Sequence, residues 1–191
     1  MFQAELEDIA TIQVGYQARS KIKEAPDSQF HLIQGKDFDA QGNLCTDTLL
    51  AFAPERKTES YLVHKGNILL QSRGAEHTAY CIHDELSNTL AAGSFYIIRI
   101  KDKSVTPAYL AWWLNQRPAQ AFFETQASGT IMSFVSKSTV SQLKVQIPSL
   151  HVQQQIQNIV ELGNREQELL NKLAENRAQL VQAACMKALK Q

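Results

Sequence analysis

The sequence predicts an α+β protein in which one mixed α/β domain is followed by a long C-terminal α-helix. Up to about residue 148, short apolar runs alternate with turn residues and with one clear helix signal. After Pro148, glycine and proline almost disappear, and Gln, Glu, Leu, Asn, Lys and Ala dominate. We therefore expect a domain over residues 1–148 and a helix over residues 149–191.

Five short segments have the composition of β-strands. Each is rich in apolar or β-branched residues and is bounded by Gly, Asp, Lys or Pro. The predicted strands are residues 30–33, 68–71, 79–82, 95–100 and 143–147.

One helix is clearly signalled inside the domain. Thr106 can cap it, Pro107 suits the first helical position, and apolar residues recur at helical spacing up to Leu114. This helix should end near Asn115, because Pro118 disfavours helical backbone at the preceding residue.

The C-terminal helix carries a near-heptad apolar stripe. Forty residues of helix would be about 60 Å long at ~1.5 Å per residue, which favours a partner helix over packing on its own domain, the alternative interpretation. The stripe contains Ile156, Ile159, Leu162, Leu169, Leu173, Leu180 and Ala183, with Glu166 and Asn176 at the same spacing. We predict dimer contacts at Ile159, Leu162, Leu169, Leu173, Asn176 and Leu180.

Composition and charge limit the function. With 191 residues the chain suits one domain plus an appendage, and its 44% hydrophobic and 20% charged residues are ordinary for a globular protein. The net charge of zero argues against a protein that coats nucleic acid without specificity. Any contact with DNA must therefore come from local groups of side chains.

The cysteines and the N-terminal residues favour a cytoplasmic protein. Cys45, Cys81 and Cys185 are far apart and form no CxxC pair, which argues against disulfides and a zinc site. The N-terminal residues are acidic where a secretory signal would be basic and apolar, and no apolar run is long enough to span a membrane.

The sequence motifs of common catalytic and cofactor sites are absent. The chain contains no GxxxxGK[ST], GxGxxG, HExxH or GxSxG motif, so we expect no catalytic residues, metal or cofactor. A small enzyme using Cys81 with His77 or His83 is an alternative only if folding assembles a site without a sequence motif.

Polar and basic side chains in the predicted loops are the candidates for DNA contacts. Arg can pair with guanine through two hydrogen bonds and Gln with adenine, so Gln34, Gln71 and Arg73 are the most informative. Lys and small hydroxyl side chains typically hold phosphates, and a solvated surface position is the alternative for each residue. The predicted DNA-binding residues are Tyr16, Arg19, Lys21, Lys23, Gln34, Lys36, Gln71, Ser72, Arg73, Ser128, Thr130, Ser133 and Lys137.

Two segments resemble the specificity subunits of type I restriction-modification systems. Residues 65–74, Lys-Gly-Asn-Ile-Leu-Leu-Gln-Ser-Arg-Gly, resemble the family's GDIL-x-x-RxG segment, with Asn67 where Asp is common. Residues 128–156 are similar to the family's passage into its conserved helix. There Ser149 replaces the second proline of Pro-Pro-Leu, and Val152 replaces an acidic residue.

The resemblance implies a DNA reader that directs chemistry done by other subunits. Members of the family carry two recognition domains and two helices that pair antiparallel, so this sequence resembles half of a subunit. It implies a homodimer joined by an antiparallel coiled coil, which would read an interrupted palindrome in double-stranded DNA. The implied partners are a DNA methyltransferase (modification) subunit and a restriction/translocase subunit. A protein-interaction adaptor with a docking helix is the alternative.

Overall fold

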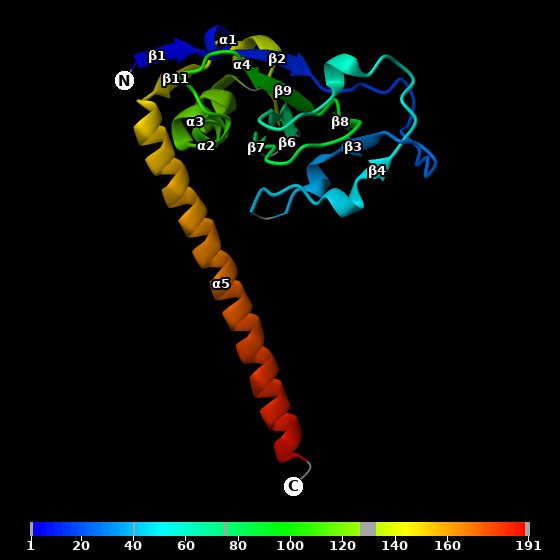
Figure 1. The fold of residues 1–191 in the computed structure, drawn as a ribbon, viewed down its shortest axis with the longest axis vertical. Coiled ribbons are helices and arrows are strands. Elements are labelled where there is room, and N and C mark those ends of the chain that lie inside the picture. Colours follow the sequence, from blue (N-terminus) through cyan, green and yellow to red (C-terminus); the bar gives the residue numbers. More distant parts are fainter. Residues whose placement is uncertain (1, 40, 75, 127–132, 190–191) are drawn as a thin grey trace. The chain divides into compact units, whose positions relative to one another are not determined.

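The computed structural model describes residues 2–39, 41–74, 76–126 and 133–189 and divides the chain into two compact units, Met1–Gln153 and Gln154–Gln191 (Figure 1). The first unit mixes helices with short strands, and the second is helical. The α+β fold class predicted from the sequence is therefore confirmed. No helix in the described residues combines the length and hydropathy that a membrane span requires.

Most strands belong to the first unit's two larger sheets. The four-stranded antiparallel sheet has the order β2-β9-β5-β7, and the three-stranded sheet has the order β4-β3-β8, with β3 and β8 parallel. Two strand pairs, β1-β11 and β6-β10, complete the set. The strands are β1 (Phe2–Glu5), β2 (Ala10–Val14), β3 (His31–Ile33), β4 (Leu50–Ala51), β5 (Ile68–Gln71), β6 (Arg73–Gly74), β7 (Ala79–Cys81), β8 (Thr89–Ala91), β9 (Phe95–Ile100), β10 (Ser133–Phe134) and β11 (Lys144–Ile147).

All five predicted strands are present, as β3, β5, β7, β9 and β11, with ends that agree to within a residue. The sequence analysis missed β1 and β2, which a four-residue helix, α1 (Leu6–Ile9), separates. These strands are defined by pairing with distant partners, β11 and β9. Their own residues carry only a weak alternating pattern.

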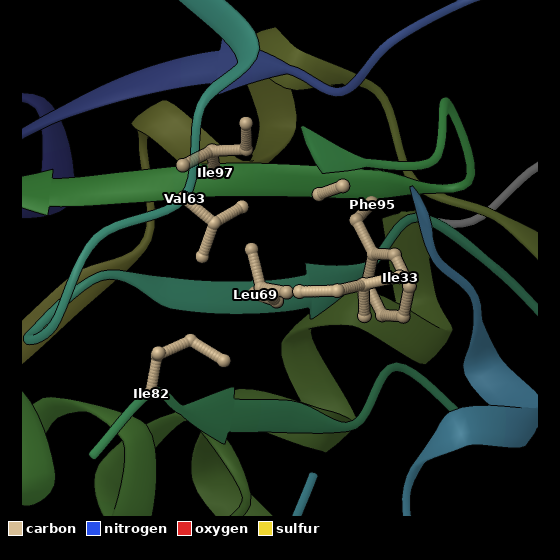
Figure 2. Packing of buried hydrophobic residues seen from close by; sticks show 7 residues of the cluster. Ile33, Val63, Leu69, Ile82, Phe95 and Ile97 are labelled. Atoms are coloured by element: carbon tan, nitrogen blue, oxygen red, sulfur yellow. The ribbon is translucent and has the colours of Figure 1, made fainter. Parts of the chain in front are cut away.

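A core cluster joins the two larger sheets. Leu69 of β5 and Ile97 of β9 pack with Ile33 of β3, and Val63 and Ile82 extend the same cluster (Figure 2). Because successive residues of a strand face opposite sides, full burial of β9 from Phe95 to Ile98 means that both faces of this central strand are covered.

The predicted helix cap is confirmed. Helix α2 (Pro107–Leu114) begins after Thr106, whose Oγ1 accepts a hydrogen bond from the Tyr109 amide at 3.4 Å. The expected end near Asn115 is also correct, but a further helix, α3 (Arg117–Gln126), follows directly and includes Arg117. Pro118 lies in its first turn, where a missing amide proton costs no helical hydrogen bond.

The C-terminal half of the chain contains a five-residue helix and a very long one, α4 (Lys137–Ser141) and α5 (Leu150–Ala188). The amide of Val152 approaches Ser149 Oγ at 3.5 Å, which makes Ser149 a weak cap. The predicted C-terminal helix is therefore present.

Candidate nucleic-acid interface

The chain at the end of β5 has one buried side chain between two more exposed ones. Ser72 is buried, and its Oγ donates a hydrogen bond to the Ser94 carbonyl at 2.8 Å. Gln71 and Arg73, the residues on either side, are half-buried and exposed. Ser72 is a bend between the two strands, so Gln71 ends β5 and Arg73 begins β6.

Strand β10 lies beside β6 and brings an aromatic ring under Arg73. The two strands pair antiparallel, with Arg73 opposite Phe134 and Gly74 opposite Ser133. The guanidinium carbon of Arg73 lies 5.3 Å from the centre of the Phe134 ring, within the range of a cation–π contact. The Val135 amide also donates to the Ser72 carbonyl at 3.0 Å, which ties the two segments together.

A buried histidine supports this strand pair. His77 Nδ1 lies 3.0 Å from the Gln71 carbonyl oxygen, and His77 Nε2 lies 2.9 Å from Ser133 Oγ. Because a carbonyl can only accept, Nδ1 carries the proton, and in the neutral ring Nε2 accepts from the Ser133 hydroxyl. His77 thus holds the β5 end and β10 at a fixed distance.

A 3₁₀ turn at Gly35–Asp37 packs against Gln71. A side chain on Gly35 would bring its Cβ to 2.8 Å from Gln71 Nε2, so glycine permits the close approach. The turn is held by the buried Asp37, whose Oδ2 accepts from the Gln34 amide at 2.7 Å. Lys36, in the same turn, is exposed.

The structure therefore gathers several predicted DNA-binding residues from three distant segments. Lys137 follows β10 closely and begins α4 beside the Ser136 cap, with its side chain exposed. We call this group the β5–β10 cluster. It consists of Gln34, Lys36, Gln71, Arg73, Ser133 and Lys137.

A sequence model of the family described as the type I restriction modification DNA specificity domain matches residues 4–175. The chain belongs to this family. A search of curated proteins found no match for this specificity domain.

Solved structures show the same fold. They include the S subunit of a type I restriction-modification system from M. genitalium (TM-score 0.61, 13% identity) and the HsdS subunit from Thermoanaerobacter tengcongensis (TM-score 0.63, 15% identity). A third is a structure described as the basis of complex assembly and conformational transition of the type I R-M system (TM-score 0.67, 16% identity). The alignment covers 91% of this chain for the M. genitalium and Thermoanaerobacter tengcongensis structures and 94% for the third. This chain spans less than half of each matched chain: 41% for M. genitalium, 44% for Thermoanaerobacter tengcongensis and 42% for the third.

Residues 65–74 of the specificity domain show why their pattern suits the fold. Gly66 and Gly74 have φ values of 80° and 141°, which glycine adopts most readily. Asn67 is buried, and its Oδ1 accepts from the His64 amide at 3.1 Å, a role that an aspartate carboxylate can also fill. Counted from Gly66, the arginine position of GDIL-x-x-RxG falls on Ser72, and Arg73 occupies the unspecified position after it.

Two predicted DNA contacts are wrong, because their side chains belong to the interior of the specificity domain. Tyr16 is 1% exposed, packs against Phe52, and accepts a hydrogen bond from the Glu55 amide at 2.7 Å through its hydroxyl. Ser72 is 2% exposed and bonded to Ser94, as described above. The residue types alone suggested that both side chains are exposed and can contact DNA. Their burial excludes such a contact.

The remaining predicted residues lie apart from the β5–β10 cluster or cannot be placed. Arg19, Lys21 and Lys23 are exposed on the segment between β2 and β3, where Ser20 and Ala25 hydrogen-bond to Glu55 and Ala51. Ser128 and Thr130 lie outside the described residues. Sequence reasoning missed Phe134 and the supporting role of His77, which only strand pairing reveals.

The geometry gives no support to a cysteine nucleophile. Burial raises the pKa of the Cys81 thiol to about 11, so the thiol stays protonated at neutral pH. A nucleophilic cysteine needs the opposite shift. Both ring nitrogens of His77 are occupied by other partners, and His83 is exposed. No group of three potential metal ligands occurs among the described His, Cys, Asp and Glu residues.

Proposed function

We propose that the chain is the sequence-reading component of a type I restriction-modification system, with residues 1–148 as its recognition domain. The family match carries the proposal, and the β5–β10 cluster supports it. That cluster combines amide, hydroxyl and cationic side chains, the types that contact base edges and phosphates.

We propose that the protein acts as a homodimer. Apolar side chains along α5 are 51% to 71% exposed at Ile159, Leu162, Leu169, Leu173 and Leu180. Burial of each against a second helix would contribute roughly 1.5–3 kcal/mol.

A twofold dimer would read two identical, inverted half-sites separated by an unread spacer. The 39 residues of α5 amount to about 58 Å of helix, longer than one ~34 Å turn of DNA. We assign the chemistry to partners: a methyltransferase subunit and a restriction/translocase subunit.

Selection of bound duplexes from a random pool tests this function. The purified chain, with and without a type I methyltransferase subunit, should enrich a bipartite motif with inverted half-sites. If no sequence motif is enriched in either condition, the result would contradict the proposal and favour the alternative of a protein-interaction adaptor.

A further inference from the structure

We propose that Arg73, whose guanidinium lies over the Phe134 ring, reads a guanine in each half-site, and that Phe134 is the positioning residue for this contact. The inference rests on the proposed function, since it names one base and one reader within the same DNA-binding site. It goes further by assigning a role to Phe134.

The first step is the geometry of the arginine. Arg73 is exposed, and its guanidinium carbon lies 5.3 Å from the centre of the Phe134 ring. Phe134 is the residue directly opposite Arg73 in the β6-β10 strand pair. A cation–π contact attracts the guanidinium to the aromatic ring without using its N–H groups as hydrogen-bond donors to another side chain. The contact therefore limits the positions that the exposed guanidinium of Arg73 can adopt.

The second step is the match to a base. Guanine offers two neighbouring acceptors, N7 and O6, in the major groove, and an arginine fork bonds both at once. Such a pair requires the guanidinium to lie in the plane of the base. A contact with a phosphate does not require this coplanar geometry, because a flexible cation can make it. Restriction of Arg73 by Phe134 reduces the entropy lost on forming the planar pair.

The third step is the support beneath the pair. The β6-β10 pair is fixed by the Val135–Ser72 backbone hydrogen bond and by His77, which bonds both Gln71 and Ser133. The Tyr96 hydroxyl also donates to the Val135 carbonyl at 2.9 Å. An antiparallel two-stranded ribbon is narrow enough to enter a major groove. Lys36 and Lys137 of the β5–β10 cluster add positive charge that favours approach to DNA.

The test uses the full chain and the duplex that it enriches from a random pool. Each guanine of the motif is replaced in turn by 7-deazaguanine, which lacks the N7 acceptor. We expect one replacement per half-site to weaken binding by the wild type, and the Arg73→Ala protein to be insensitive to that same replacement. In a repeated selection, Arg73→Ala and Arg73→Lys should lose the preference for this guanine alone, with roughly a 5- to 150-fold loss for the original site.

Phe134→Leu should partly relax the preference for the same guanine, because the ring that orients Arg73 is gone. Lys144→Ala, which removes an exposed cation on β11, is the control and should leave the motif unchanged. The 7-deazaguanine comparison uses the wild type and Arg73→Ala only, so a folding defect in Phe134→Leu cannot decide its result.

Three outcomes overturn the inference. Equal loss of affinity for all duplexes by Arg73→Ala, with a salt slope lower by about one, would make Arg73 a phosphate contact. An unchanged motif in Arg73→Ala would remove Arg73 from recognition. Either result overturns this inference alone, whereas a wild type that enriches no motif overturns the proposed function as well.

Discussion

At the scale of single residues, Gln153 connects three backbone groups from two segments that lie far apart in the sequence. Its side chain is completely buried, and Oε1 accepts from the Thr106 amide at 2.9 Å. Its Nε2 donates to the carbonyls of Ser104 at 2.7 Å and Pro148 at 3.0 Å. One amide side chain therefore holds the start of α5 to the segment that leads into α2.

Gln153→Ala should lower the free energy of unfolding by about 2–4 kcal/mol, because it removes three hydrogen bonds of a buried side chain and creates a cavity. Urea denaturation followed by circular dichroism measures the change. Gln154→Ala is the control: Gln154 is exposed, and its bond to Asn158 should contribute little. Equal midpoints for the two variants would contradict the role of Gln153.

At the scale of elements, α5 combines an apolar stripe with a polar face. Glu168 lies between Arg165, at 2.8 Å, and Lys172, and hydrogen bonds from Lys172 and Arg165 lower the pKa of this carboxyl. All three side chains are largely solvated, so these ion pairs add little stability. The stability of the helix therefore depends mainly on its residues' helical preference and, in the proposed dimer, on burial of the stripe.

Gly163 is the weak point of α5. It lies inside the helix, and a Cβ placed on it would meet no atom within 4 Å. Gly163→Ala should therefore stabilise the helix by roughly 0.5–1 kcal/mol, because alanine loses less backbone entropy on folding. Thermal unfolding followed at 222 nm should show a higher midpoint. The reverse change on an exposed position, Ala178→Gly, should lower it by a similar amount. A lower midpoint for Gly163→Ala would show that this position needs glycine.

At the scale of the whole molecule, the proposed homodimer depends on the exposed apolar stripe of α5. Leu169→Glu with Leu173→Glu places charges on the proposed interface, where they would lose hydration on pairing. We expect a monomer of 21.4 kDa in sedimentation equilibrium, where the wild type should have about twice that mass. DNA binding should also weaken, because two linked readers bind a bipartite site more tightly than one.

The matched control adds the same charge to the polar face of α5, as Asn164→Glu with Asn171→Glu. This protein should remain dimeric, since both positions face away from the heptad stripe. A wild type that sediments as a monomer, or a double leucine variant that stays dimeric, would contradict the proposed interface.

The local features of the fold could be predicted from the sequence, because their signals come from residues a few positions apart. Thr106 and Pro107 marked the start of α2, and the scarcity of Gly and Pro after Pro148 marked α5. Helix α3 was missed because Pro118 ends a helix in some positions and begins one in others. Strands β1 and β2 were missed because distant partners define them.

The sequence by itself determined the fold class, the long helix with its apolar stripe, and the resemblance that the family match confirms. Tertiary structure decided which polar side chains are available for recognition. It buried Tyr16 and Ser72, and it placed Phe134 against Arg73. The physical reason is that helix and strand preferences act between near neighbours, whereas exposure depends on which segments pair across the chain.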